Sequence, residues 1–179
     1  MLLIKKDSLA STQFQYLWLS ALVILLDQLT KIIVKATMPI YKSVEILGNF
    51  FMLTHVQNTG AAFSISLGSP ATNRIFFVGV TVLTIGFVVY LMYRANTKLQ
   101  RISLSLIIGG AIGNLIDRVL YGYVTDFFDF DFFHFIMQRF PVFNIADSTI
   151  VIAMGLLILD LIINKNPGEA SMKINNPEI

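Results

Sequence analysis

The chain has 179 residues, of which 55% are hydrophobic and only 13% are charged, and its formal net charge is +2. A disordered chain needs low hydrophobicity and high charge, so that class is excluded, and soluble domains carry about twice this charged fraction. The mean hydropathy of +0.72 instead indicates a chain dissolved in a lipid bilayer. The small net charge argues against nucleic-acid binding. The absence of cysteine excludes disulfides, thiolate metal sites and a cysteine nucleophile.

Four apolar segments are long enough to cross a membrane, and we predict spans at about 16–36, 75–93, 102–120 and 145–163. The second is the clearest, because its 19 residues carry no charge. At ~1.5 Å per residue it covers roughly 28 Å, close to the hydrocarbon thickness of a bilayer. The predicted fold class is membrane α-helical, with four transmembrane helices in a single domain over 1–179 and a loose polar tail at 168–179.

The first span has a second interpretation. Lys5 and Lys6 precede an apolar run from Tyr16 to Leu26, which is also the pattern of a cleaved signal peptide. The run is followed by Asp-Gln-Leu-Thr-Lys, without the small residues of a cleavage site. A retained helix is therefore the better interpretation.

Basic residues predict the orientation of the spans. The connection between the second and third spans holds Arg94, Lys98 and Arg101 within eight residues, and both tails add lysines. The basic residues on the other side are spread over two longer loops. By the positive-inside rule, both termini are predicted to lie in the cytoplasm.

The two outward loops, at 38–73 and 121–144, differ in composition. The middle of the first, from Val44 to Val56, mixes β-branched and aromatic residues and predicts strands lying on the membrane surface. The second is dominated by phenylalanine and aspartate, and its rings suit the level of the lipid headgroups.

Polar residues gather at the outer ends of the predicted spans, whereas the inner ends show nothing comparable. Polar groups inside a membrane are costly, so each group is a functional hypothesis. In chain order, the groups are Asp27-Gln28 with Lys31, Asn58-Thr59-Gly60, Asn114 with Asp117-Arg118, Asp126, and Asn144 with Asp147.

Each group also has a purely structural interpretation. Asp27 and Lys31 have the spacing of a helical ion pair, or Lys31 reaches the headgroups. The Asn58–Gly60 segment is typical of a turn. The small residues of Gly109–Gly113 indicate close helix packing.

The remaining polar residues have structural alternatives too. Asp117 and Arg118 form an interfacial ion pair in the simplest interpretation, and Asp147 has the position of a helix cap. His55 and His134 are far apart in the sequence and are interpreted as interfacial. Without an H-E-x-x-H pair or a third ligand, no zinc site is predicted.

Carboxylates remain as the credible catalysts. Two carboxyl groups close together in a poorly hydrated site cannot both ionise cheaply, so one keeps its proton. The ionised group can then take a proton from water while its neighbour polarises a carbonyl. Asp126 and Asp147 bracket one loop and lie at the same interface, so they can meet. Asp117 is a competitor, although Arg118 beside it favours permanent ionisation.

Five motifs occur in order along the chain. They are Asp27-Gln28-x-x-Lys31, Asn58-x-Gly60-Ala61-Ala62-Phe63, Gly109-Gly110-Ala111-x-Gly113-Asn114-x-x-Asp117-Arg118, Val124-x-Asp126-Phe127 and Phe143-Asn144-x-Ala146-Asp147. Together they resemble the signature blocks of the lipoprotein signal peptidase family, also called signal peptidase II. The resemblance covers most of the chain, from about Asp27 to Asp147.

The resemblance implies a multi-pass aspartyl endopeptidase of the bacterial inner membrane, with its active site at the outer face and an extracytoplasmic β-sheet cradle. It implies that diacylglyceryl-modified prolipoproteins are cleaved on the N-terminal side of the lipidated cysteine, by direct water attack. Carried over by motif, the catalytic dyad is Asp126 and Asp147, and the substrate-binding or supporting residues are Asp27, Asn58, Asn114, Arg118 and Asn144.

The resemblance further implies a monomer that contacts membrane lipids, needs no metal or cofactor, and is inhibited by globomycin. It carries no role onto Asp129, Asp131, His55 or His134. Two other classes of function stay open from the residues alone. A small transporter would distribute acids through the membrane depth, and a non-catalytic assembly factor would use Asp126 and Asp147 only as caps.

Overall fold

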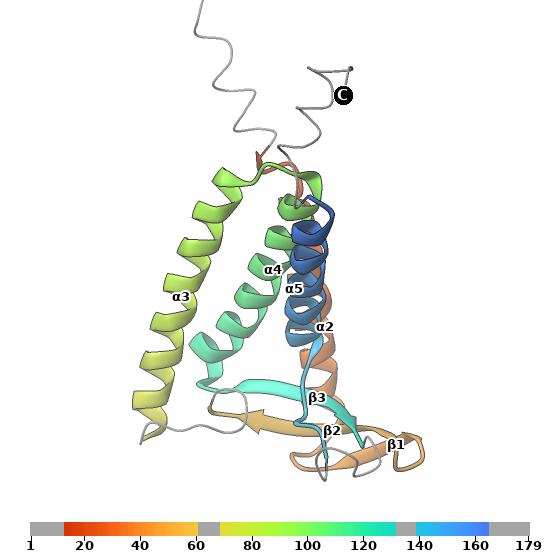
Figure 1. Cartoon of the computed structure of the whole chain (residues 1–179). Coiled ribbons are helices and arrows are strands. Elements are labelled where there is room, and N and C mark those ends of the chain that lie inside the picture. Colours follow the sequence, from red (N-terminus) through yellow and green to blue (C-terminus); the bar gives the residue numbers. More distant parts are fainter. Residues whose placement is uncertain (1–12, 61–68, 132–138, 165–179) are drawn as a thin grey trace, which may run out of the picture.

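A computed structural model describes residues 13–60, 69–131 and 139–164. In chain order its elements are α2 (Leu17–Thr37), β1 (Ser43–Leu47), β2 (Phe51–Asn58), α3 (Pro70–Arg94), α4 (Lys98–Tyr121), β3 (Val124–Phe130) and α5 (Ile145–Ile163). The helices form a bundle, and the sheet lies across one end of it (Figure 1). The start of α2 and the end of α5 lie at the opposite end, which we call the far end, in contrast to the sheet end.

The predicted fold class is confirmed, since these four helices are long and apolar enough to cross a membrane and a small sheet accompanies them. Several predictions fall outside the described residues. These are Lys5, Lys6, the tail at 168–179, His134 and the Ala61–Phe63 part of the second motif.

Two helices begin earlier than the apolar pattern predicts, because polar caps extend them. The Ser69 hydroxyl accepts a hydrogen bond from the backbone N–H of Thr72, at 3.2 Å, and α3 therefore begins at Pro70 rather than at 75. In the same way, the Thr97 hydroxyl accepts from the backbone N–H of Gln100, and α4 begins at Lys98. The connection between α3 and α4 is consequently three residues long and not eight.

The sheet has three antiparallel strands in the order β1-β2-β3. The strands predicted between Val44 and Val56 are confirmed as β1 and β2. The third strand was not predicted, because its phenylalanine-rich sequence was interpreted only as an interfacial loop. In the register of β2 and β3, Val56 lies opposite Asp126 and Asn58 lies opposite Val124. This pairing brings the second and fourth motifs together.

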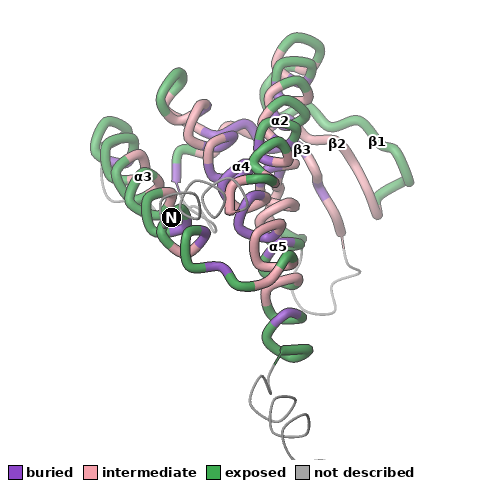
Figure 2. Tube along the Cα trace, turned by 90° about the horizontal axis from the view of Figure 1, so that it is seen from above, coloured by how far each residue is buried: buried purple, intermediate pink, exposed green. Residues whose placement is uncertain are grey.

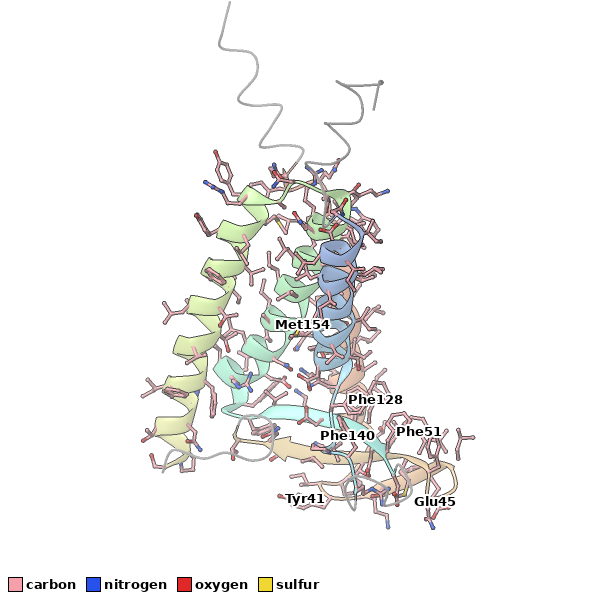
Figure 3. All side chains as sticks on the ribbon, viewed as in Figure 1. Tyr41, Glu45, Phe51, Phe128, Phe140 and Met154 are labelled. Carbon is pink, nitrogen blue, oxygen red and sulfur yellow. The ribbon has the colours of Figure 1, made fainter. Side chains whose placement is uncertain are left out.

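Aromatic rings pack on the helix side of the sheet. Phe51 stacks on Phe130 with ring centroids 4.5 Å apart, and Phe130 stacks on Phe143 at 5.8 Å. Figure 3 shows Phe51 and Phe128 on the side of the sheet that faces the helices, and Glu45 on the other side. Strand alternation explains this division, since successive side chains point to opposite faces.

Helix α4 runs through the centre of the bundle, between α3 on one side and α2 and α5 on the other (Figure 2). Its glycines permit this close packing, as predicted. A Cβ on Gly109 would lie 2.9 Å from the Cα of Ser20, and a Cβ on Gly110 would lie 2.7 Å from the carbonyl oxygen of Ala146. The outer faces of α2, α3 and α5 expose leucine, isoleucine and valine, as expected for helices that contact lipid.

Candidate active site

Lys31 of α2 is the centre of a buried polar network at the sheet end of the bundle. Its ammonium nitrogen lies 2.8 Å from Asp27 Oδ2 and 3.6 Å from Asp117 Oδ2, and it donates to Asn114 Oδ1 at 2.8 Å. The side chains of Lys31, Asp27 and Asp117 are fully inaccessible. The predicted ion pair is therefore confirmed. The alternative, in which Lys31 reaches the headgroups, is wrong because the acids of α2 and α4 enclose the ammonium group.

Asp27 joins three helices. Its Oδ1 accepts a hydrogen bond from the backbone N–H of Ala146, at the start of α5, at 3.0 Å. Its Oδ2 occupies the space beside Gly113 of α4, where an added Cβ would lie 2.6 Å away. Gln28 follows and donates to the carbonyl oxygen of Gly113 at 3.0 Å. A glycine at this point of α4 thus makes room for the carboxylate.

Asp117 connects the helices to the sheet. Its Oδ2 accepts from the backbone N–H of Thr125 at 2.9 Å, and its Oδ1 lies 3.4 Å from the ammonium of Lys35. The interfacial Asp117–Arg118 pair is wrong, since among the described residues the ion-pair partners of Asp117 are the two lysines of α2. The Arg118 guanidinium lies over the Phe77 ring of α3, 5.5 Å from its centroid.

Asn58, the last residue of β2, makes two kinds of contact. Its side-chain Oδ1 accepts from the backbone N–H of Gly60 at 3.0 Å, which is the predicted turn. Its Nδ2 donates to Asp126 Oδ2 at 3.1 Å. The turn and the site contact therefore use different atoms of one amide group.

Asn144 lies between Asp126 and Asp147 and bonds to both. Its Nδ2 donates to Asp126 Oδ1 at 2.6 Å, and its Oδ1 accepts from the backbone N–H of Asp147 at 2.9 Å. Asp147 Oδ2 accepts from the backbone N–H of Asn144, which completes a capping box, while its Oδ1 accepts from Asn114 at 2.7 Å. Asn144 is the N-cap residue, and Asp147 closes the box from within the first turn of α5.

The environment of Asp126 favours the protonated carboxyl. The side chain is only 2% exposed, and its burial, followed by the negative charge of Asp147, raises the pKa of Asp126 to about 7. Hydrogen bonds from Asn58 and Asn144 and the charge of Lys31 act in the opposite direction. A carboxyl with a pKa near neutrality can exchange a proton at physiological pH, which is what general acid–base chemistry requires.

The structure brings together all seven residues that the sequence nominated, from three helices, two strands and one cap. They are Asp27, Asn58, Asn114, Arg118, Asp126, Asn144 and Asp147. Arg118 belongs to the group because its charge acts on both Asp126 and Asp147. Lys31 lies in the first motif but is not among the site residues that the resemblance implies, and its spacing from Asp27 was the signal for its place in the network.

Two other polar residues, to which the resemblance assigns no role, are buried in the sheet. His55 is 3% exposed, and its Nδ1 lies 2.8 Å from the carbonyl oxygen of Met38. Asp129 is also buried; it accepts from Thr54 and from Arg139, each at 2.5 Å. Within the described part of the chain, the hydrogen-bond partners of His55 and Asp129 are residues of the sheet and its adjoining loops, and Asp126 is not among them.

The far end also holds one buried carboxylate. Asp160 of α5 is inaccessible and accepts hydrogen bonds from Thr97 Oγ1 and Gln100 Nε2, each at 2.7 Å, and from Asn164 Nδ2 at 3.0 Å. These neutral donors join the end of α5 to the cap of α4.

A cavity of about 680 Å³ opens beside the polar network, between the start of α3 and the turn from α4 to β3. Its lining residues are Thr59, Pro70, Ala71, Arg74, Ile75, Tyr121, Gly122 and Tyr123.

Comparison with known proteins identifies the family of this chain. The profile of the signal peptidase (SPase) II family matches residues 19–163, which contain every element of the fold except the first residues of α2. The chain belongs to the signal peptidase II family. It is accordingly a multi-pass membrane protease of the aspartic type that cleaves signal peptides.

Sequence relatives from several bacteria support the assignment to the signal peptidase II family. The chain is 44% identical over 161 residues to a lipoprotein signal peptidase of Pasteurella multocida, covering 86% of this chain and 92% of the relative. It is 45% identical over 141 residues to one of Halothermothrix orenii, covering 78% and 90%. It is also 40% identical over 168 residues to one of Photorhabdus laumondii, covering 93% and 97%.

Two solved structures of bacterial membrane enzymes have the same fold as this signal peptidase. A bacterial membrane enzyme solved by the in meso method at 2.3 Å resolution superposes with a TM-score of 0.74 at 34% identity, covering 87% of this chain and 90% of that one. A second, at 1.9 Å, gives a TM-score of 0.73 at 35% identity, covering 84% and 94%.

Proposed function

We propose that this signal peptidase removes the signal peptide from diacylglyceryl-modified prolipoproteins, on the N-terminal side of the lipidated cysteine, with Asp126 and Asp147 as its catalytic dyad. The family and the relatives named lipoprotein signal peptidase support this choice of substrate. We further propose that it acts as a monomer, because residues of one chain supply the whole polar network.

The observation that carries the dyad is the position of Asn144. One amide group bonds to Asp126 through Nδ2 and to the backbone of Asp147 through Oδ1. Asp147 Oδ2 in turn accepts from the backbone N–H of Asn144 at 3.3 Å, so Asn144 contacts both carboxyl groups and fixes their positions relative to each other. The charge of Asp147 also contributes to the raised pKa of Asp126, as expected for two carboxyl groups that face one site.

In the proposed mechanism, the carboxyl groups of Asp126 and Asp147 together hold one proton. The ionised carboxylate takes a proton from a water molecule, whose oxygen attacks the scissile carbonyl carbon, while the protonated carboxyl donates to the carbonyl oxygen. When the tetrahedral intermediate collapses, the C–N bond breaks and a proton passes to the leaving amine. No covalent link to the enzyme forms. The two carboxyls titrate as one coupled unit, so neither role is assigned to a single residue.

The positions of the acids favour a protease over a transporter. A proton relay through the membrane needs titratable groups along the path. The central helix α4 carries no charged residue from Ile102 to Ile116. The acids at the two ends of the bundle are thus separated by an uncharged stretch of the helix that both groups contact.

We propose that the sheet end faces the outside of the cell and that both chain termini are cytoplasmic. The basic residues of the sheet end, among them Lys42, Arg74, Arg118 and Arg139, are spread over several elements. Arg94 and Lys98 lie at the far end, beside the short connection between α3 and α4. This distribution supports the orientation given by the positive-inside rule.

The decisive experiment is cleavage of a purified, diacylglyceryl-modified prolipoprotein by the purified enzyme. Asp126→Asn and Asp147→Asn are each expected to reduce kcat by about three orders of magnitude or more, because each removes an acid–base group of the reacting pair. Asp160→Asn is the matched control, since it changes a buried carboxylate of the same protein at the far end.

Globomycin should inhibit the wild-type reaction, and a chelator should not. Full activity of either dyad variant, with normal expression and folding, would contradict the dyad. Equal cleavage of a prolipoprotein that lacks the diacylglyceryl group would contradict the proposed substrate.

A further inference from the structure

Residues 139–143, which we call the edge segment, lead into α5 and lie along the edge of β3 that β2 leaves free (Figure 1). The backbone N–H of Phe140 donates to the carbonyl oxygen of Phe130 at 3.1 Å, and that of Phe143 donates to the carbonyl oxygen of Phe128 at 3.1 Å. In return, the N–H of Phe128 donates to the carbonyl oxygen of Phe143 at 2.7 Å. The edge segment is therefore paired antiparallel with β3.

This pairing decides where Asn144 lies. Asn144 directly follows the edge segment and bonds to both carboxyl groups of the dyad. A shift of a paired strand by one residue turns its side chains to the other face, so a slipped edge segment would take Asn144 away from Asp126. Pro141 has no backbone N–H to donate, which leaves the edge segment with few hydrogen bonds to β3. Backbone pairing alone thus specifies the register only weakly.

An ion pair between Asp129 of β3 and Arg139 supplies a side-chain anchor. Arg139 Nε donates to Asp129 Oδ1 at 2.5 Å, and the two side chains are 37% and 6% exposed. Thr54 Oγ1 of β2 donates to Asp129 Oδ2 at 2.5 Å. Since the one hydroxyl proton of Thr54 goes to this carboxylate, Ser43 of β1 donates to Thr54, at 2.9 Å. Side chains of all three strands therefore connect to the first residue of the edge segment.

The anchor lies on the face of the sheet opposite the dyad. Glu45 and Asp129 occupy one row of the sheet, since both pair with the same residue of β2. Figure 3 shows Glu45 on the side away from the helices and Phe128 on the side that faces them. Because side chains alternate along a strand, Asp126 shares the face of Phe128 and Asp129 does not. The anchor can therefore influence the dyad only through the edge segment.

We propose that Asp129 and Arg139 are positioning residues, whose ion pair fixes the register of the edge segment on β3 and so holds Asn144 between the carboxyl groups of the dyad. The inference rests on the proposed function, because it concerns the geometry of that dyad. A displacement of about 1 Å at a reacting group can cost roughly a hundredfold in rate. The register of the edge segment therefore matters directly for turnover.

The test is cleavage of a diacylglyceryl-modified prolipoprotein by the full-length enzyme in detergent. Arg139→Gln and Asp129→Asn each remove one charge of the pair. Each is expected to lower kcat about tenfold and to leave KM within about twofold, because the peptide still binds while the dyad is displaced. The double variant should lose no more than either single variant, since both break the same contact. Unchanged kcat in both single variants would overturn the proposal.

Two further variants act as controls. Arg139→Lys restores a cation and should recover most of the kcat that Arg139→Gln loses. Glu45→Gln makes the same carboxylate-to-amide change as Asp129→Asn, in the same row of the sheet but at an exposed position, and should leave kcat and KM unchanged. Since Arg139 is the more exposed partner, Arg139→Gln decides the test if Asp129→Asn does not fold.

The pH profile separates positioning from a general loss of stability. Burial and the charge of Asp147 raise the pKa of Asp126, and the hydrogen bond from Asn144 opposes them. Loss of that bond in Arg139→Gln should raise this pKa further, so the alkaline limb of kcat/KM should move to higher pH. The charged groups that act on Asp126 stay in place in this variant; they are Asp147, Lys31 and Arg118. Reduced activity with an unmoved profile would contradict the proposal.

Hydrogen exchange reports on the edge segment directly. The backbone N–H groups of Phe140 and Phe143 should exchange faster in Arg139→Gln than in the wild type, and Glu45→Gln should not change their exchange. Unaltered exchange together with a reduced kcat would also overturn the proposal. Failure of the proposed function is distinct, because the wild-type enzyme would then not cleave the lipidated substrate, or Asp126→Asn would cleave it at the full rate.

Discussion

Asp27 and Asp117 share one hydrogen-bond network with Asp126 and Asp147, yet the two pairs of carboxylates have different partners. The first pair lies against the ammonium group of Lys31, with all three side chains fully buried. The second pair is held by neutral amides: Asn58 and Asn144 donate to Asp126, and Asn114 donates to Asp147.

The difference teaches how one buried network can contain both structural and reactive acids. A lysine within ion-pair distance compensates a carboxylate charge locally, and such a pair then serves to join helices. An amide holds a carboxyl in position without supplying a full positive charge. The mutual repulsion of Asp126 and Asp147 is then left partly uncompensated, and this contributes to the raised pKa of Asp126.

The largest expected effect on stability comes from removing the shared cation. Lys31→Met should lower the free energy of unfolding by about 3–5 kcal/mol, because it leaves Asp27 buried without its counter-charge. Thermal unfolding in detergent measures this change. Lys35→Met is the matched control and should cost about 1 kcal/mol or less, since Lys35 is partly exposed. Equal losses in the two variants would remove the distinction between the buried cation and the peripheral one.

The second prediction concerns the pH dependence of stability at Asp126. Its pKa is about 7 in the folded protein and close to 3.8 in the unfolded chain, so the folded state binds more protons between those values. Stability therefore falls as pH rises from about 4 to 7. Asp126→Asn removes the titrating group, so the stability of the variant relative to the wild type should rise by about 1–3 kcal/mol between pH 4 and pH 8.

Unfolding of the wild type and Asp126→Asn, measured side by side across this range, tests the prediction. A difference in stability that stays the same from pH 4 to pH 8, or that shifts in favour of the wild type, would mean that folding does not raise the pKa of Asp126.

The third prediction tests the space that Asp27 needs. Gly113→Ala should lower the free energy of unfolding by about 1–3 kcal/mol, because the new Cβ would lie 2.6 Å from Asp27 Oδ2. Gly86→Ala in α3 has open space around its Cβ and should be neutral or stabilising by about 1 kcal/mol. Thermal unfolding separates the two, and an unaffected Gly113→Ala would show that the Asp27 carboxylate can move aside.

The smallest effect is expected at the far end. Asp160→Asn should cost about 1 kcal/mol of stability, since its three donors then meet an amide that offers one acceptor fewer. Peptidase activity should stay within about twofold of the wild type. A large loss of activity would extend the functional site through the whole bundle.

Much of this architecture was predictable from local patterns. Apolar runs fixed the four spans, because a span must be apolar over most of its length. The ordered motifs identified the family, and the i, i+4 spacing identified the Asp27–Lys31 pair. The starts of α3 and α4 were predicted too late because Ser69 and Thr97 are polar, and a polar N-cap extends a helix beyond its apolar part.

Tertiary structure decided the rest, since partners distant in sequence leave no local signal. β3 was missed because its pattern of Phe and Asp has no strand alternation of apolar and polar residues, and only pairing with β2 makes it a strand. That Asp117 bonds to Lys31, Lys35 and the backbone of Thr125, rather than to adjacent Arg118, depends on how closely α2 packs against α4. Composition and motifs were enough to predict a membrane protein, its family and its candidate acids. Packing determined which of these acids contact a lysine and which are held only by amide groups.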